Sequence, residues 1–427
     1  MSASNDFIQQ EKATFSRDQW IIIALLAFLQ FTIILDFMIL SPLGAILMPA
    51  MKISPSQFGM VVSGYAVSAA LSGFLTAGFA DKFDRKKLLM FFYCGFILGT
   101  LFCALAPNFH MLLAARIVTG LFGGVIGSIV FAIMTDLFPL QQRGRVMGIL
   151  QTAFAASQVM GLPLGLWLSS KWGWHSPFLM IVFVSTLVGF VIWAKLPSIT
   201  AHLALQTDKK ALTHMMHTVA TPKYAFAFVL TGILSMGGYM IMPFASAYTV
   251  HNLGIDIDNL PLLYMVTGCV SIFVGPLVGR ISDAIGGYTT FIFGSIVTAI
   301  MTVIYTNLGS TSLGMLMVVN SLMFVGIFSR MIPSQALMSG IPAPASRGAF
   351  MSINASLQQL AGGLGSIVAG MIVSEGADGK IQHFEYVGYI MVGFTALTVY
   401  MMYFINRDVM ASRTKTASPS VEPSLGH

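Results

Sequence analysis

Residues 143–149 read Arg-Gly-Arg-Val-Met-Gly-Ile, and residues 347–353 read Arg-Gly-Ala-Phe-Met-Ser-Ile, 204 positions further along the chain. Residues 78–81, Gly-Phe-Ala-Asp, are echoed 202 positions later by residues 280–283, Arg-Ile-Ser-Asp. Arg116 also has a looser counterpart in Arg330. Chance could produce one such match, but three at similar spacing predict a chain built from two similar halves.

The repeated stretches open two of twelve long apolar runs. With 56% hydrophobic and 9% charged residues among 427, the chain carries more apolar surface than a soluble domain could bury. A bilayer core about 30 Å thick requires roughly 20 mostly apolar residues per helix. The runs lie near 20–48, 57–80, 88–107, 111–135, 146–170, 177–196, 224–250, 259–281, 289–308, 311–338, 348–374 and 385–405. They predict an all-α polytopic membrane protein with twelve transmembrane helices in two pseudo-symmetric six-helix bundles.

Positive charges in the connections predict the orientation of these helices. If the N-terminus lies in the cytoplasm, 17 Lys and Arg residues fall on the cytoplasmic side, and only Lys52, Lys171 and Lys380 fall on the other side. Connections rich in Lys and Arg stay in the cytoplasm, so both termini are expected there. The same bias explains the net charge of +6, and no nucleic-acid partner is inferred from it.

A long polar connection between the sixth and seventh runs divides the chain. The predicted parts are a cytoplasmic N-terminal tail over 1–18, a six-helix bundle over 19–196, a cytoplasmic central loop over 197–223, a second six-helix bundle over 224–405 and a cytoplasmic C-terminal tail over 406–427. The first run is too long for the apolar region of a cleaved signal peptide. We therefore expect an uncleaved, multi-pass protein of the cell's inner (plasma) membrane.

Two stretches carry a resemblance to a known family. Residues 78–87 resemble the loop signature of the major facilitator superfamily between spans two and three, in which an Asp is followed by a Gly-Arg-basic run. Residues 113–120 resemble the span-four motif of that family, in which an Arg precedes a Gly by four positions. The resemblance covers about residues 15–410 and implies the major facilitator fold. Within the family, the chain is most similar to bacterial twelve-span drug/proton antiporters, including sugar-efflux-like and multidrug-efflux permeases.

The chain departs from the family pattern in two places. Asp84 stands where the loop signature has Gly. The antiporter motif of span five normally has adjacent Gly and Pro, whereas residues 161–165 here read Gly-Leu-Pro-Leu-Gly. Neither departure affects the resemblance to the superfamily, but the second weakens the resemblance to antiporters.

Two charged residues inside the apolar runs are the candidates for proton coupling. Asp36 is the only carboxylate near the middle of a run, and a charge at that depth costs about 2.5–3.5 kcal/mol on insertion scales. It is expected to bind a proton or a cationic substrate, or else to be a structural carboxylate tied to a polar neighbour. Arg116 stays charged and must be paired or hydrated. The resemblance implies a position near the proton site, and a structural link between helices is the alternative.

A second group of residues is expected to form a latch on the cytoplasmic side. A carboxylate and a guanidinium at helix ends can cap a helix and form an ion pair. In the family, this network holds the outward-facing state closed. The residues expected in the latch are Gly78, Asp81, Arg85, Lys86 and Asp136, with Asp136 as the partner of Arg85. For much of the basic run 82–87, the alternative is a role only in setting the topology.

The family architecture places spans one, four, seven and ten around a central substrate cavity. Candidates for its lining are a Met and aromatic set in span seven and Gln and Asn residues in spans five and eleven. Packing or lipid contact is the alternative for the Met and aromatic residues. For Arg330, a position at the cytoplasmic interface is the alternative. The candidates are Gln151, Gln158, Met236, Tyr239, Met240, Arg330, Asn354 and Gln358.

The leading hypothesis is a secondary transporter that exports a small amphipathic molecule (a drug, sugar or metabolite) by alternating access, driven by inward proton movement. The alternatives are a uniporter or a proton symporter that imports a sugar or organic anion, and more distantly a membrane receptor or enzyme. The chain has no phosphate-binding loop that would use ATP. We expect a monomer that interacts with a small-molecule substrate, protons and lipid, that is not an enzyme, and that has no cofactor or metal site.

Overall fold

The computed structural model describes residues 15–76, 82–200, 203, 218, 221–342 and 347–417. The first half of the chain forms α1 (Arg17–Ile39), α2 (Gly44–Met51), α3 (Pro55–Thr76), α4 (Arg85–Ala104), α5 (Phe109–Leu137), α6 (Leu140–Ala156), the π-helical turn η2 (Ser157–Gly161), α7 (Leu162–Trp172) and α8 (Ser176–Lys195). The second half forms α10 (Pro222–Ile241), α11 (Ala245–His251), the short η4 (Ile257–Asn259), α12 (Leu260–Ile285), α13 (Gly287–Thr306), α14 (Leu313–Ser339), α15 (Arg347–Ile372), the hairpin β1 (Ser374–Glu375) and β2 (Ile381–Gln382), and α16 (Phe384–Ala417).

Among the described residues, eleven helical segments are long and apolar enough to cross a bilayer. The twelfth membrane-length helix is α3, whose 22 residues include several Ser and Gly. Most side chains of α3 between Phe58 and Ser72 are buried, because α5 covers one side of the helix and α15 covers another. A helix enclosed by protein in this way needs little apolar surface for lipid.

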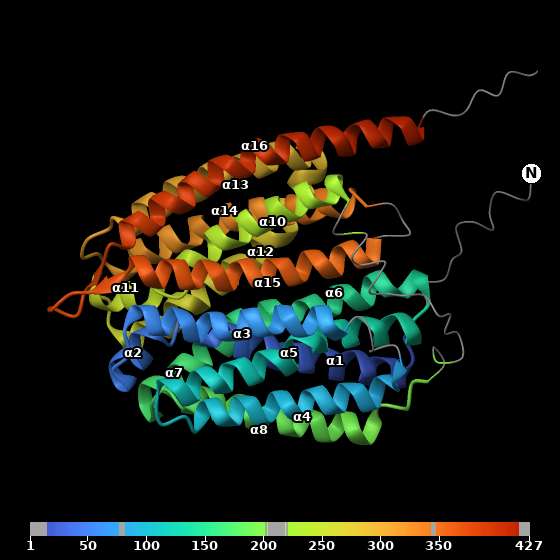
Figure 1. The fold of residues 1–427 in the computed structure, drawn as a ribbon, viewed down its shortest axis with the longest axis horizontal. Helices are drawn as coiled ribbons and strands as arrows, with labels where there is room; N and C mark the ends of the chain where they lie inside the picture. The colour runs from blue at the N-terminus through green and yellow to red at the C-terminus, as the bar shows by residue number, and fades with distance from the viewer. Residues whose placement is uncertain are drawn as a thin grey trace, which may run out of the picture.

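The helices form two bundles that correspond to the two halves of the chain. In Figure 1, α1–α8 lie together in the lower half of the view and α10–α16 in the upper half. Two strips of contact join the bundles: α3 packs against α15, and η2 with α7 packs against α12. We call this interface the seam. In each strip, the second membrane helix of one half contacts the fifth membrane helix of the other half. The two strips are therefore equivalent, as expected for parallel repeats around an axis along the membrane normal.

The two ends of the molecule differ. α1 begins and α16 ends at one end, which we call the terminal end, whereas α2 and α11 lie at the opposite end (Figure 1). Around α2 and α11 one hydrophobic core is continuous across the bundles, and it includes Phe58 of α3 and Phe244 before α11. Nearer the terminal end the second bundle has its own core, built around Phe228 and Phe350. The bundles are therefore packed together at the α2–α11 end, which we call the closed end.

Helix breaks at the closed end repeat between the halves. The run 20–48 is interrupted between α1 and α2 near Pro42, and the seventh run is interrupted between α10 and α11 near Pro243. Proline removes a backbone hydrogen bond and clashes with the preceding turn, so a long helix breaks there. The Ser246 hydroxyl, after the second break, donates to the Ser41 carbonyl at 3.0 Å and accepts from the Ala45 amide at 3.4 Å. These bonds join the two broken helices across the seam.

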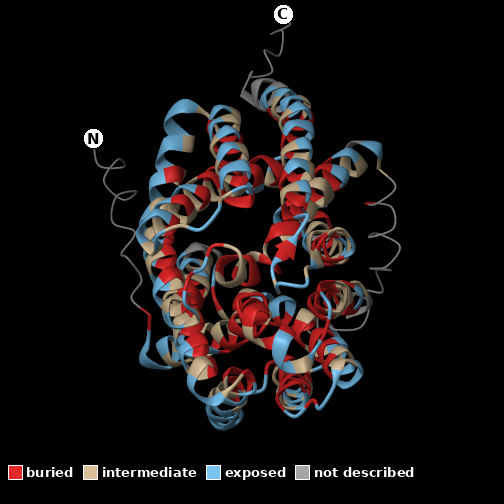
Figure 2. Cartoon of the chain, turned by 90° about the vertical axis from the view of Figure 1, so that its left-hand side faces the viewer, coloured by how far each residue is buried: buried red, intermediate tan, exposed pale blue. Residues whose placement is uncertain are grey.

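Burial follows the expectation for a membrane protein. Seen along the bundle axis in Figure 2, exposed positions lie mainly on the outer faces of the helices and buried ones lie toward the interior. Many of the exposed side chains are large and apolar, such as Phe183 and Phe190 of α8 and Phe273 of α12. A soluble protein rarely exposes so much apolar surface, and lipid solvates it here.

Candidate functional site

A fully buried ion pair lies inside the first bundle. The Arg116 Nη1 of α5 donates to the Asp36 Oδ2 of α1 at 2.8 Å, and the exposed fractions of the two side chains are 1% and 0%. The Thr100 hydroxyl of α4 donates to the other carboxylate oxygen, Oδ1, at 3.1 Å. Pairing and hydrogen bonding compensate for the loss of hydration, without which neither charge would be stable at this depth. The two residues chosen from the sequence as the proton site therefore lie in contact.

The pair is nearer the closed end than the sequence suggests. Asp36 is at the middle of the apolar run 20–48, but α1 ends at Ile39, so Asp36 belongs to its last turn. Arg116 is in the second turn of α5, and Thr100 is in the last turns of α4. Asp36 thus lies in the turn of α1 that comes just before the helix break near Pro42.

Aromatic rings connect the ion pair to the seam. The Tyr65 ring of α3 lies over the Arg116 guanidinium, 4.7 Å from its central carbon to the ring centroid. Tyr65 contacts Phe37 of α1 at 5.4 Å between centroids, and Phe37 contacts Tyr239 of the second bundle at 6.0 Å. Tyr239 was expected at the substrate cavity, whereas Phe37 and Tyr65 were missed by the sequence analysis. The sequence of an apolar helix does not show which residues its aromatic side chains contact. Only the packing of the helices therefore identifies Phe37 and Tyr65.

On its other face, α1 is held by small residues of η2 and α7. A Cβ added at Gly161 would lie 2.7 Å from the Leu35 side chain, and one added at Gly165 would lie 2.7 Å from Ile39. These glycines bound the stretch 161–165 that departs from the antiporter motif. Their spacing of four still lets the two helices approach closely in a membrane. The stretch therefore fixes the position of the helix turn that carries Asp36.

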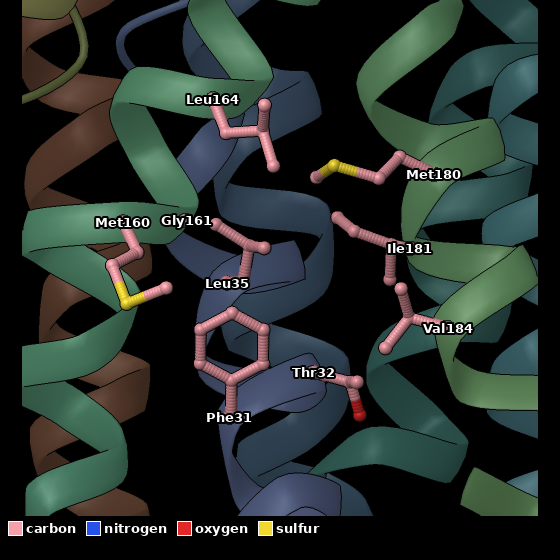
Figure 3. Close-up of a pocket in the computed structure, with 9 residues that line it drawn as sticks. All are labelled: Phe31, Thr32, Leu35, Met160, Gly161, Leu164, Met180, Ile181 and Val184. Carbon is pink, nitrogen blue, oxygen red and sulfur yellow. The ribbon is translucent and has the colours of Figure 1, made fainter. Parts of the chain in front are cut away.

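A crevice of about 100 Å³ opens beside this contact (Figure 3). Its floor comes from α1, one wall from η2 and α7, and the other wall from α8. The lining residues are Phe31, Thr32, Leu35, Met160, Gly161, Leu164, Met180, Ile181 and Val184. All are apolar except Thr32, whose hydroxyl is bonded to Tyr93 and to the Leu29 carbonyl. Because Met160 is 68% exposed, the crevice faces the lipid side of the bundle rather than the seam.

The latch residues are only partly described. Arg85 Nε of α4 lies 3.1 Å from Asp136 Oδ2 of α5, so the expected partners are in contact. Both belong to the first bundle, and the Arg85 side chain is 7% exposed. Lys86 is partly exposed in the first turn of α4. Gly78 and Asp81 lie outside the described residues. The role of this group as a latch stays a prediction.

Asp84, the departure from the loop signature, acts as the N-cap of α4. Its carboxylate accepts from the Lys86 amide at 2.9 Å, from the Ile199 amide at 3.1 Å and from the Ser198 hydroxyl. Partial burial alone would raise the pKa of Asp84, but these hydrogen bonds outweigh it and hold the pKa below its usual range. The carboxylate therefore ties the segment after α8 to the start of α4, a link that a glycine could not make.

The face of α15 toward α3 and α10 combines contacts to both helices with exposed positions. Asn354 is bonded to Thr231 of α10 at 2.6 Å, and Ser356 lies against Gly73 of α3. Ala355, between these two contacts, is nevertheless exposed, and Gln358 one turn later is partly exposed. Helical geometry directs both toward the gap between α3 and α10. The place of Asn354 and Gln358 in a cavity lining stays a prediction.

The remaining cavity candidates behave differently from one another. Gln151 is exposed, and Met236 is partly buried. Gln158 is 6% exposed in η2, where its backbone meets Gly268 of α12 across the seam. Met240 is completely buried in the core that is continuous across the bundles, which agrees with the packing alternative. Its place in the cavity lining stays a prediction.

Arg330 of α14, the last of the cavity candidates, is buried. Its guanidinium donates to Thr398 of α16 at 3.2 Å and lies 5.8 Å from the Phe291 ring of α13, so both contacts are within its own bundle. It is 6% exposed and does not meet the seam through either contact. Arg330 is not the structural counterpart of Arg116 either. α5 begins at Phe109 and α14 at Leu313, an offset of 204, which pairs Arg116 with Asn320.

The family model described as Major Facilitator Superfamily matches the chain twice, over residues 26–234 and 227–426. The chain belongs to the major facilitator superfamily. It is therefore a secondary transporter and not an enzyme. The predicted all-α fold of two six-helix bundles is confirmed for this member of the superfamily.

Relatives and structures of the superfamily agree with this assignment. The uncharacterized MFS-type transporter YceJ of Bacillus subtilis (strain 168) is 25% identical over 370 residues, which cover 86% of this chain and 90% of YceJ. A probable sugar efflux transporter of Helicobacter pylori (strain HPAG1) is 28% identical over 153 residues, 36% of this chain and 39% of that protein. The crystal structure of a bacterial homolog of the human lysosomal transporter Spinster, inward-facing and unoccupied, has a TM-score of 0.72 at 16% identity and covers 95% of this chain and 100% of its own. This last likeness concerns the fold alone.

Proposed function

We propose that this transporter exports a small amphipathic molecule in exchange for protons, and that Asp36 carries the proton. The observation that carries the proposal is the ion pair of Asp36 and Arg116, which has almost no exposure and lies behind the aromatic contacts of the seam. An ionisable group enclosed at membrane depth is a functional candidate. The likeness to a probable sugar efflux transporter supports export as the direction.

The orientation belongs to the same proposal. If both termini are cytoplasmic, as the positive charges of the connections favour, the closed α2–α11 end faces the outside. The described conformation would then be inward-facing, with Asp36 ionised and paired. Such a state follows release of a proton to the cytoplasm and precedes export of substrate. A reporter fused after residue 410 should then be cytoplasmic, and one inserted within 251–257 should be on the outside; the opposite pattern would overturn the orientation.

The cycle needs two forms of Asp36. Opening of the α2–α11 end would admit a proton, which binds Asp36 and removes the ionic partner of Arg116. Return to the inward-facing state would release the proton and restore the pair. Each charge that moves through 100 mV of membrane potential supplies about 2.3 kcal/mol, so export needs no ATP.

The test uses everted membrane vesicles that contain wild-type protein and hold an acidic lumen. Ethidium, tetraphenylphosphonium, xylose and lactose serve as probe substrates. An antiporter makes the lumen more alkaline on addition of its substrate, whereas a uniporter gives no proton signal and a symporter makes the lumen more acidic. Asp36→Asn should abolish the signal and uphill transport while it leaves downhill exchange in place.

Asp18→Asn provides a matched control, because Asp18 lies exposed in the first turn of the same helix. It should transport at the wild-type rate. Undiminished gradient-driven transport by Asp36→Asn would overturn the role of Asp36. A proton signal of the opposite sign with xylose or lactose would favour the second candidate function, sugar–proton symport.

A further inference from the structure

We propose that Tyr65 is the second partner of Arg116: its ring holds the guanidinium while Asp36 is protonated, and so couples the proton to the state of the seam. The proposal rests on the proposed function of Asp36. Its starting observation is the ring of Tyr65, which is 2% exposed and lies 4.7 Å from the central carbon of the Arg116 guanidinium.

When Asp36 is protonated, the charge of Arg116 no longer has an ionic partner. A proton taken from water forms an O–H bond at Asp36 Oδ2, and the charge-assisted hydrogen bond from Arg116 Nη1 to that oxygen is lost. Arg116 cannot neutralise itself by giving up a proton. Its Nε already has no hydrogen-bond partner among the described residues. The cation therefore needs another source of stabilisation at the same place.

The face of Tyr65 offers that stabilisation. A guanidinium within about 6 Å of an aromatic centroid is attracted by the ring quadrupole, most strongly where water is excluded. This contact carries more of the interaction once the carboxylate is neutral. The surrounding helices offer no alternative carboxylate among the described residues. The titratable groups close to the pair are Cys103 of α4 and Tyr65 itself, with Tyr239 of α10 beyond the ring.

The backbone of α5 fixes the position of the ring. A Cβ added at Gly123 would lie 2.6 Å from the Tyr65 hydroxyl oxygen, and one added at Gly120 would overlap the Tyr65 carbonyl. Glycine at these two positions lets α3 approach closely enough to place the ring over Arg116. The backbone of its own bundle therefore fixes one side of the ring, and the contact with Phe37 supports another side.

The same ring is also connected to the second bundle through Phe37. Tyr65 packs on Phe37, and Phe37 packs on Tyr239, which itself lies against Gly362 of α15, 2.9 Å from the Cβ position to the ring. Movement of the second bundle away from the first would remove Tyr239 from this stack. The freedom of Phe37 and Tyr65, and with it the hold on Arg116, would change in the same movement.

The proposal can be tested without a known substrate. Purified wild-type protein in lipid nanodiscs is titrated while the infrared carbonyl band of a protonated carboxylic acid is recorded. The part of this band that is missing in Asp36→Asn belongs to Asp36. Tyr65→Leu removes the partner of the protonated state, so the midpoint of the Asp36 band should move to lower pH by about one unit, a tenfold loss in proton affinity. Tyr65→Phe keeps the ring and should leave the midpoint unchanged.

Two further variants separate this role from general damage to the fold. Phe37→Leu leaves Tyr65 and the ion pair intact but removes the support of the ring, so it should move the midpoint in the same direction by less. Tyr93→Phe removes a buried tyrosine hydroxyl elsewhere in the bundle and should not move it. Gel filtration shows which variants are folded.

The outcomes distinguish the two proposals. If the wild type shows no band that Asp36→Asn removes, Asp36 does not exchange a proton, and both proposals fail. If the band is present but both Tyr65→Leu and Phe37→Leu titrate like the wild type, only the role of Tyr65 fails. A Tyr65→Phe midpoint displaced as far as that of Tyr65→Leu would assign the effect to the hydroxyl and overturn the cation–ring contact.

Discussion

A guanidinium and a carboxylate that are both enclosed at membrane depth stabilise the fold only while they remain paired. Removal of one partner leaves an uncompensated charge, which typically costs 3–5 kcal/mol, whereas replacement of both partners by neutral groups is far less costly. Asp36 and Arg116 satisfy the conditions for this asymmetry, since they are 0% and 1% exposed and their atoms lie 2.8 Å apart.

We therefore expect Arg116→Met to destabilise the protein by about 3–5 kcal/mol at pH 8 and by less at pH 5, where the unpaired Asp36 can take up a proton. Asp36→Asn/Arg116→Met should recover most of the loss at pH 8. Denaturant unfolding in detergent measures four proteins: the wild type, Asp36→Asn, Arg116→Met and the double variant. Additive losses in the double variant would contradict direct coupling between the two residues.

Asp84 gives a prediction at the surface. Asp84→Ala removes the N-cap of α4 and the link to Ile199, and should cost about 0.5–2 kcal/mol at neutral pH. Because the pKa of Asp84 is held below its usual range, its contribution is complete above the usual value for a carboxyl and is lost as the pH falls through the lowered pKa. Unfolding temperatures of the wild type and the variant should thus differ at pH 7 and converge in strong acid. A constant difference would show that the charge of Asp84 contributes nothing.

The sequence identifies Asp36 and Arg116 as unusual because charged residues are rare in long apolar runs. It cannot show that they meet, since 80 positions separate them. Tyr65, Thr100 and Phe37 resemble many other helical residues, and their role depends on which faces of α1, α3, α4 and α5 come together. Met240 is a cavity candidate as one of the Met and aromatic residues of the seventh run, with packing as the alternative, and its burial in the core depends on helix contacts that the run does not show.

At the scale of elements, α3 and α5 depend on glycine for their close approach. A Cβ at Gly124 would lie 2.6 Å from the Ala69 carbonyl, whereas a Cβ at Gly127, one turn further along α5, would meet nothing within 4 Å. The backbone of α3 cannot yield as a side chain would, because its hydrogen bonds fix it.

Gly124→Ala should consequently destabilise the protein by about 1–3 kcal/mol through overpacking. Gly127→Ala should be neutral or stabilising by up to about 1 kcal/mol, because alanine is the better helix former. The measurement is the unfolding temperature of each purified variant. Equal effects of the two substitutions would mean that α3 and α5 are not held in close contact.

The apolar runs predict the helices well because membrane helices must be apolar over the bilayer thickness. The structure adds details that hydropathy does not carry. The run 20–48 divides into α1 and α2, run five contains the π-turn η2, and α16 continues to Ala417, beyond the last apolar run. In the last case the side chains become polar while the backbone stays helical, so the predicted tail 406–427 begins inside a helix.

At the scale of the whole molecule, the two halves meet through matching helix breaks. Ser246 bridges the break near Pro243 to the break near Pro42 through two hydrogen bonds. Lys171 and Asp258, 3.5 Å apart and both more than half exposed, join the same end of the two bundles at the surface. An exposed pair of this kind contributes at most about 1 kcal/mol. The buried contacts around Ser246 therefore account for most of the closure.

Locking this end should trap the molecule in the described state. In a variant with Cys94, Cys103 and Cys269 replaced by alanine, Ala45→Cys and Ser246→Cys place two thiols where the Ser246 hydroxyl meets the Ala45 amide at 3.4 Å. Mild oxidation or a short bifunctional maleimide should join them and abolish transport, because alternating access requires the α2–α11 end to separate. A reductant should restore transport after disulfide formation, and each single-cysteine protein should be unaffected. In a separate labelling experiment, Ala355→Cys, exposed on α15, reports the opposite end, and the 45–246 link is made beforehand as a disulfide by mild oxidation, which leaves the thiol at 355 free to react. Its reaction with a small maleimide should be at least as fast in the linked protein as in the unlinked one, since the linked molecule cannot leave the described state, in which Ala355 is exposed. Slower labelling, or full transport by the linked protein, would show that the α2–α11 end is not a gate.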